Sequence, residues 1–93
     1  MIVFMLMTLP IPGSEDILDL APTGDGIGYP ASITRRTGNG SSLWTVLPPE
    51  GSRQDAWVAV RIEGPRVIAN SWSGYLVHLD LDTGGEIVRT LTK

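Results

Sequence analysis

The last third of the chain alternates short apolar runs with turn signals. The runs are rich in Val, Ile and aromatic residues, which favour a pleated, half-buried backbone, and they span residues 56–63, 66–72, 75–81 and 86–91. Three turn sequences separate them, namely Gly64-Pro65, Ser73-Gly74 and Asp82-Thr83-Gly84-Gly85. Pro and Gly inside a helix cost about 3 and 1 kcal/mol, so a helical interpretation of this segment is unfavourable. The pattern predicts one antiparallel four-stranded meander over residues 56–92.

The run over residues 75–81 shows the strand period of two most clearly. One predicted face carries Tyr75, Val77, Leu79 and Leu81, and the other carries Leu76, His78 and Asp80. Other runs place apolar residues side by side, as in Val67-Ile68 and Ile87-Val88. Because both faces of such strands are apolar, we expect a sheet that is covered on both sides.

Two further strands are predicted upstream, over residues 31–37 and 42–47, joined by a turn at Gly38-Asn39-Gly40. Residues 13–20 fit either one capped helical turn or a short strand over residues 17–20. The predicted fold class is therefore all-β, an antiparallel meander of about six to seven short strands. We divide the chain into an N-terminal apolar strand and loop segment, residues 1–30, and a β-meander, residues 31–93.

The first seven residues, MIVFMLM, are wholly apolar and leave three alternatives open. A signal segment normally carries a charged start and a small-residue cleavage site, which this stretch lacks. A membrane anchor that spans the bilayer needs about 20 apolar residues, but Pro10 and Pro12 interrupt this stretch early. We favour the third alternative, an N-terminal β-strand, and predict no membrane span.

A partial internal repeat links the two halves of the chain. Residues 37–46, TGNGSSLWTV, are similar to residues 83–91, TGGEIVRTL, so that Trp44 aligns with Arg89. Gly40 and Gly85 are aligned as well, 45 residues apart. A period of about 40–45 residues with strands throughout is typical of β-propeller blades. Each blade is a four-stranded antiparallel sheet that stacks on its neighbours.

Residues 40–92 resemble a β-propeller blade of the pyrroloquinoline-quinone-type and tryptophan-aspartate-like repeat families. Residues 74–89, GYLVHLDLDTGGEIVR, follow the pattern G-x-L-x-x-L-D-x-x-T-G-x-x-x-W of those repeats. Gly85 is an extra turn residue, and Arg89 stands where the docking Trp usually lies, whereas Trp44 holds that position in the earlier copy. The resemblance implies blade-like sheets. It does not imply quinone chemistry, which needs a full ring of blades and a cofactor site.

Composition narrows the classes of partner and chemistry. The chain of 93 residues forms one domain at most, and its net charge of −3 includes no basic cluster beyond Arg35-Arg36. A nucleic-acid-binding surface needs a basic stripe, so no nucleic-acid partner is predicted. The chain contains no Cys, which removes disulfides, thiolate metal sites and Cys nucleophiles. No cofactor is indicated, and the cellular compartment stays open.

The sequence offers no convincing catalytic group. His78 is the single His, and it is either a general base oriented by Asp80 or, as we favour, a partly exposed residue on a sheet face. The acidic turn around Asp80 and Asp82 lacks the later ligands of a calcium loop. Residues 23–29, TGDGIGY, lack the spacing and the Lys of a phosphate-binding loop. We therefore predict no metal site and no enzyme activity.

The aromatic residues are the strongest lead to a binding site. Trp72 and Tyr75 flank the Ser73-Gly74 turn, and Asn70 lies close by in the sequence. Aromatic side chains with short polar neighbours form stacking surfaces for sugars or proteins. Trp72, Tyr75 and Asn70 are therefore the predicted ligand-binding residues, whereas the two other Trp residues are expected in the core.

The leading hypothesis is a non-catalytic β-repeat module for protein–protein or self-association, either complete or a fragment of a longer propeller. The alternative is a carbohydrate- or small-ligand-binding module that uses the aromatic patch at Trp72 and Tyr75. An exposed sheet edge invites pairing with another chain, so an oligomer is expected.

Overall fold

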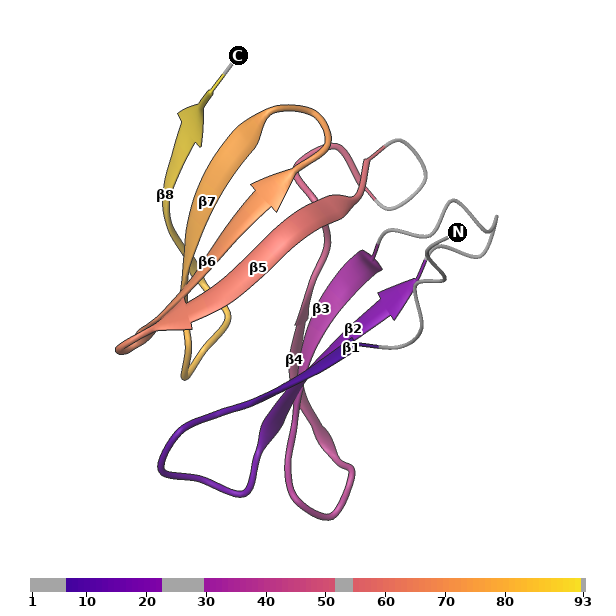
Figure 1. Ribbon diagram of the computed structural model, residues 1–93, viewed down its shortest axis with the longest axis vertical. Helices are drawn as coiled ribbons and strands as arrows, with labels where there is room; N and C mark the ends of the chain where they lie inside the picture. Colours follow the sequence, from indigo (N-terminus) through magenta and orange to yellow (C-terminus); the bar gives the residue numbers. More distant parts are fainter. Residues whose placement is uncertain (1–6, 23–29, 52–54, 93) are drawn as a thin grey trace.

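Two four-stranded antiparallel β-sheets pack against each other in this protein (Figure 1). The computed structural model describes residues 7–22, 30–51 and 55–92. The first sheet has the order β1-β2-β3-β4, and its strands are Met7–Pro10, Ile17–Pro22, Pro30–Arg36 and Ser42–Val46. The second sheet has the order β5-β6-β7-β8, with strands Trp57–Glu63, Arg66–Ser71, Tyr75–Asp80 and Glu86–Leu91. No helix occurs in the described residues.

The all-β class and the four-stranded meander over residues 56–92 are confirmed. The described residues hold eight strands, where about six to seven were expected, because β1 and β2 complete the first sheet. β2 is thus a strand and not the helical turn of the other alternative. The boundary drawn near residue 30 falls between β2 and β3, which are neighbours in one sheet. The stretches at residues 1–6 and 23–29 lie outside the described residues.

The first sheet turns an apolar face toward the second sheet. Its inward residues, read from the strand register, are Leu9, Leu18, Leu20, Ile33, Arg35, Trp44 and Val46. Leu18, Leu20 and Ile33 are at most 1% exposed. The opposite face is polar, and there the hydroxyls of Thr34 and Thr45 form a hydrogen bond of 2.9 Å. A sheet with one apolar face gains free energy by burying it, and the second sheet supplies the cover.

The second sheet covers that face with its own alternating residues. Its inward residues are Trp57, Val60, Ile62, Val67, Ala69, Tyr75, Val77 and Leu79. The predicted alternation over residues 75–81 is confirmed, since Val77 and Leu79 are each 1% exposed. Trp57 is buried in the core, as expected, whereas Trp44 is half-buried and packs against the core. We expected this sheet to be covered on both faces. Among the described residues, the first sheet covers its inner face, and no second layer covers the outer face, which includes Ile68, His78 and Val88.

Two side chains of the first sheet clamp the β7–β8 turn of the second. The Leu81 carbonyl accepts hydrogen bonds from Trp44 Nε1 at 3.1 Å and from Arg35 Nη1 at 2.9 Å. Arg35 Nη2 also lies 2.9 Å from the Asp16 carboxylate, and the Arg35 side chain is only 12% exposed. The Trp44 ring lies directly over Gly84, where an added Cβ would come within 2.6 Å of Trp44 Cδ2. These contacts, which we call the inter-sheet clamp, fix the turn on the first sheet.

Asp80 holds the β7–β8 turn in the shape that the clamp needs. Its Oδ1 accepts hydrogen bonds from the amides of Asp82, at 2.8 Å, and Thr83, at 3.1 Å. The residue that accepts these bonds therefore precedes the predicted turn sequence, Asp82-Thr83-Gly84-Gly85. Gly84 has a φ of +74°, which residues with a Cβ rarely adopt. Glycine at this position therefore serves both the turn and the close approach of the Trp44 ring.

Gly84→Ala should lower the free energy of unfolding by about 2–4 kcal/mol, because the new Cβ would meet the Trp44 ring and require a positive φ. Gly40→Ala is the matched control. Gly40 also has a positive φ, +93°, but nothing lies within 4 Å of its Cβ position, so about 1 kcal/mol is expected there. Urea unfolding followed by circular dichroism measures both losses. Equal losses would contradict a tight contact between Trp44 and Gly84.

Candidate functional site

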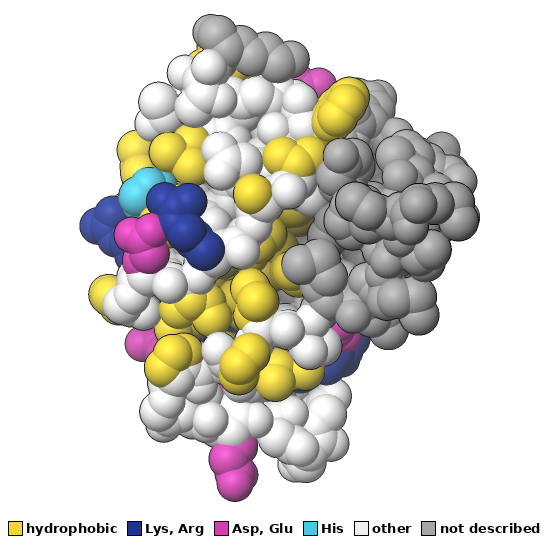
Figure 2. All heavy atoms as spheres, viewed as in Figure 1, with side chains coloured by type: hydrophobic (Ala, Val, Ile, Leu, Met, Phe, Trp, Pro, Cys, Tyr) yellow, Lys and Arg dark blue, Asp and Glu magenta, His cyan; other side chains and the backbone are white. Residues whose placement is uncertain are grey.

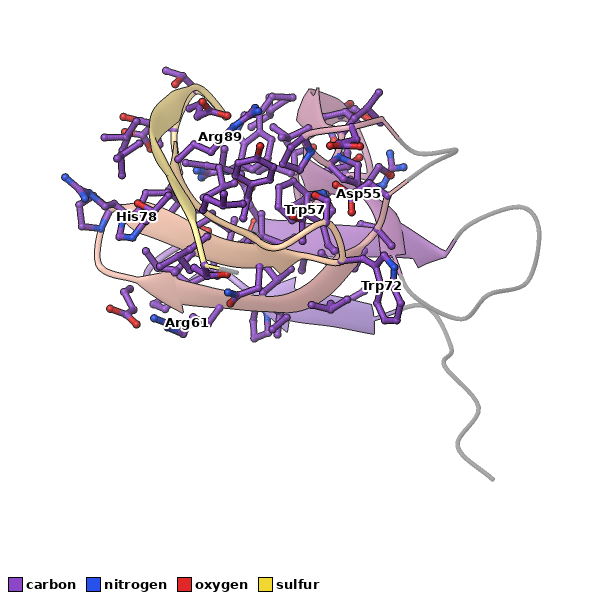
Figure 3. All side chains as sticks on the ribbon, turned by 90° about the horizontal axis from the view of Figure 1, so that it is seen from above. Asp55, Trp57, Arg61, Trp72, His78 and Arg89 are labelled. Carbon is purple, nitrogen blue, oxygen red and sulfur yellow. The ribbon has the colours of Figure 1, made fainter. Side chains whose placement is uncertain are left out.

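The β6–β7 turn presents the most exposed aromatic side chain of the described residues. Trp72 is 64% exposed and lies at the periphery of the molecule, whereas Trp57 lies in its interior (Figure 3). The Trp72 amide donates a hydrogen bond of 2.8 Å to the Ala56 carbonyl. The Gly74 amide closes the turn on the Ser71 carbonyl at 3.1 Å. The backbone that carries the indole is therefore fixed at several points.

A buried carboxylate, that of Asp55, stabilises this turn through hydrogen bonds. Asp55, which precedes β5, is 5% exposed. Its Oδ1 accepts hydrogen bonds from the amides of Ala56 and Ser73, both at 2.9 Å, and its Oδ2 accepts one from the Ser73 hydroxyl at 2.5 Å. The Ser73 hydroxyl also lies 2.8 Å from the Ser71 hydroxyl, which accepts from the Tyr75 amide at 3.0 Å. Asp55 thereby connects the segment before β5 to both sides of the turn.

The protonation of Asp55 follows from this environment. Burial acts to raise the pKa of the Asp55 carboxyl, since it disfavours the charged form. Hydrogen bonds from the Ser73 hydroxyl and from the amides of Ala56, Ser73 and Glu50 act in the opposite direction. Together they outweigh burial and hold the pKa of Asp55 below its ordinary value. The carboxylate is therefore ionised at neutral pH and acts as an acceptor for the turn.

The end of β8 is attached to the same turn. The amide and the hydroxyl of Thr92 both donate to the Gly74 carbonyl, each at 2.7 Å. Every residue of β8 is exposed, and the strand carries three of the exposed large hydrophobic side chains, Ile87, Val88 and Leu91. This contact joins the β6–β7 turn, which carries Trp72, to the edge strand β8, and we call the two together the Trp72–β8 border.

The other two predicted binding residues lie on different sides of the second sheet. Tyr75 pairs with Leu91 and packs against the core, and the Arg89 guanidinium carbon lies 5.3 Å from its ring centroid. Asn70 pairs with Leu76 on the opposite face. Trp72 is therefore the member of the predicted trio that is presented outward, and the structure does not gather the three side chains on one face.

The candidate general base has other partners. His78 is partly exposed on the outer face of the second sheet, as we favoured, and its Nδ1 lies 3.2 Å from Arg66 Nη1. Asp80, proposed to orient it, uses its carboxylate to cap the β7–β8 turn. Nearby, the hydrogen bond and charge of Arg61 lower the pKa of Glu63. Figure 2 shows the single His beside side chains of both charges. This group is a solvated, charge-paired surface.

Metal-binding clusters and membrane-spanning helices are both absent from the described residues. No group of three or more His, Cys, Asp or Glu side chains in the described ranges could hold a metal ion. Over the same ranges, there is no helix with the length and apolar character to cross a membrane. Sequence reasoning missed the network of Asp55, Ser71 and Ser73. The signal available was a carboxylate and two Ser residues beside apolar runs, which is too common to indicate a network.

Comparison with known proteins gives one family match. Residues 30–91 match a protein-family model described as a domain of unknown function (DUF7957). The matched segment is 62 residues long, two thirds of the chain, and runs from the start of β3 to the end of β8. No curated protein and no solved structure matches significantly. The match therefore supplies no activity by inheritance, and the resemblance to propeller blades stays a prediction.

Asp55→Ala should destabilise the protein by about 2–4 kcal/mol at pH 7, since the amides of Ala56 and Ser73 lose their acceptor in a buried site. The lowered pKa of Asp55 means that its stabilising effect is present above the unfolded-state pKa of about 4 and is lost as the pH falls through the folded-state pKa. The difference between wild type and variant should therefore shrink below about pH 4.

Asp82→Ala is the control for this measurement. The Asp82 side chain is 90% exposed, and its carboxylate lies 3.6 Å from Arg35. Such an exposed pair contributes less than about 1 kcal/mol. Urea unfolding between pH 3 and 7 compares the two variants. A loss for Asp55→Ala that is no larger than that for Asp82→Ala would contradict a structural role of the buried carboxylate.

Proposed function

We propose that this chain, which belongs to the DUF7957 family of domains of unknown function, is a non-catalytic β module that associates with protein chains, copies of itself included. The observation that carries the proposal is the Trp72–β8 border. Four of the seven exposed large hydrophobic side chains of the described residues lie on it, namely Trp72, Ile87, Val88 and Leu91. Val88 and Leu91 lie on opposite faces of β8, so what they share is the edge of the sheet, and exposed apolar residues along an unpaired edge mark an interaction site.

The rigidity of the border favours binding. The Trp72 turn is held by Asp55 on one side and by Thr92 on the other, so its backbone is ordered before any partner arrives. A preformed site loses less conformational entropy on association, and that saving appears as affinity. Trp is also the residue most enriched among side chains whose truncation costs binding energy. Charged groups such as Glu86 and Arg89, 2.8 Å apart, supply a polar rim.

The non-catalytic part of the proposal rests on how the candidate catalytic groups are used. His78 is engaged by Arg66, and the carboxylates of Asp55 and Asp80 are engaged by backbone amides. Each of these groups already has a structural role. General acid–base work would require one of them to face a substrate proton within hydrogen-bond reach.

Carbohydrate binding is the second candidate, and the exposed indole of Trp72 beside the partly exposed Ser73 favours it. A sugar ring stacks on such a surface, and a neighbouring hydroxyl supplies a polar contact. The inward position of Tyr75 removes the second aromatic ring of the predicted platform. We therefore place protein association first.

Trp72→Ala should weaken self-association about 30-fold, which corresponds to the ~2 kcal/mol of an aromatic hot-spot contact. Light scattering after size-exclusion chromatography, over a series of protein concentrations, gives the molar mass of each species. Leu43→Ala is the matched control, because Leu43 is 54% exposed but lies on β4 of the first sheet. It should leave the association unchanged.

Two outcomes would overturn the proposal. The first is a wild-type protein that stays monomeric at every concentration while it binds members of a glycan panel in a Trp72-dependent way. The second is an equal effect of Trp72→Ala and Leu43→Ala on the mass distribution, which would show that the border has no special part in association.

A further inference from the structure

The two sheets have four edge strands, and β8 is the least protected of them. β1 is four residues long and ends in Pro10, which cannot donate to a ladder. The register beside β4 shifts between Arg35 and Arg36, and Pro48-Pro49 follows the strand. β5 shifts its own register between Trp57 and Ala59, and it lies beside β3. β8 has neither a Pro nor a neighbour on its outer side among the described residues (Figure 1).

The backbone of β8 alternates in direction, and the register shows which residues face outward. The Thr92 amide donates to the Gly74 carbonyl, so residue 92 points its backbone groups toward β7. Tyr75 pairs with Leu91 and Leu76 with Thr90, which continues the same register. In an antiparallel pair, hydrogen-bonded and non-hydrogen-bonded positions alternate. Arg89 and Leu91 therefore direct their N–H and C=O groups away from β7.

From this edge we propose that two copies of the chain pair through β8, antiparallel, with Thr90 on the two-fold axis. This inference rests on the proposed function and names its partner, a second copy. The outward groups of Arg89 would bond those of Leu91 of the second copy, and the symmetry-related pair would do the same. The two second sheets would join into one eight-stranded sheet.

The side chains favour this register over the one centred on Arg89. A two-fold axis perpendicular to the sheet keeps each side chain on its own face, so only registers shifted by two residues compete. Centring the pair on Arg89 would set two guanidinium groups directly opposite each other, which is unfavourable. Centring it on Thr90 sets Thr against Thr, a favourable cross-strand pair, and Arg89 against Leu91. Val88, 43% exposed in the monomer, would lie opposite Thr92.

The local shape of β8 fits such a partner. Its register irregularity lies at the beginning of the strand, where Leu79 pairs with Glu86 and His78 with Val88. The segment from Val88 to Leu91 is regular and exposed. The Arg89 side chain forms an ion pair of 2.8 Å with Glu86 on the inner face of the sheet. This position leaves the outward backbone groups of Arg89 accessible.

A single-cysteine crosslinking experiment tests the register, because the chain has no Cys of its own. In Thr90→Cys the two thiols would face each other across the axis, with Cα atoms about 4.5 Å apart, within reach of a disulfide. Mild oxidation should convert most of this variant to a covalent dimer. Val88→Cys, on the same face of the same strand, is the control and should crosslink at least about tenfold more slowly, because its thiols would be about 13 Å apart.

A proline substitution tests the backbone bonds independently. Arg89→Pro removes an outward N–H and leaves the β7–β8 ladder intact, whereas Arg89→Ala loses the same side chain and keeps the N–H. We expect Arg89→Pro to raise the dimer dissociation constant at least about tenfold over Arg89→Ala. Circular dichroism and melting temperature show whether both variants are folded. If Arg89→Pro does not fold, the crosslinking of Thr90→Cys still tests the inference.

The outcomes separate this inference from the proposed function. A multimer that persists in Arg89→Pro, with equal crosslinking of Thr90→Cys and Val88→Cys, would overturn β8 pairing and leave association through another part of the border intact. A wild-type chain that is monomeric at all concentrations would overturn this inference, and it would overturn the proposed function as well if the chain also bound glycans through Trp72. Preferential crosslinking at Thr90, together with dissociation by Arg89→Pro, would support the inference.

Discussion

The structure depends on one backbone carbonyl, that of Leu81, which accepts hydrogen bonds from Arg35 and Trp44 of the opposite sheet. Each sheet has one apolar face, and burying a large side chain such as Leu or Ile contributes about 1.5–3 kcal/mol. Burial of the nine large side chains of the shared core therefore supplies far more free energy than two hydrogen bonds of about 1–3 kcal/mol each. Apolar burial is non-directional, however, and the clamp supplies the geometry. It fixes which turn of one sheet meets which strands of the other.

The same division of roles recurs at the opposite end of the second sheet. There, Trp72 contributes apolar surface to the exterior, and Asp55 holds the turn that carries it. A buried carboxylate is costly to desolvate, but hydrogen bonds to backbone amides compensate for that cost. Because the turn is ordered by contacts on both sides, the backbone that presents the indole has a defined position. A surface that is both apolar and ordered is suited to recognition. A mobile aromatic residue would lose conformational entropy on binding, and its affinity for a partner would be lower.

The sequence predicted the local structure well where periodicity and turn residues agreed. The strand over residues 86–91 was placed with its observed bounds, and the alternation from Tyr75 to Leu79 identified the inward face. That same alternation placed Tyr75 inward, yet the predicted site grouped it with Trp72 by nearness in sequence. The clamp could not be predicted, because Arg35 and Leu81 are 46 residues apart. Pairing at such a distance depends on how two sheets meet, and no local pattern records it.

Native-state amide hydrogen exchange tests most directly whether the two sheets form one clamped unit. If the shared core and the clamp hold both sheets, the slowest amides of β2 and β3 should exchange with the same free energy of opening as those of β6 and β7. That common value should equal the global free energy of unfolding from urea titration. A first sheet that opens at a clearly lower free energy than the second would contradict the account, because it would show that the clamp does not couple them.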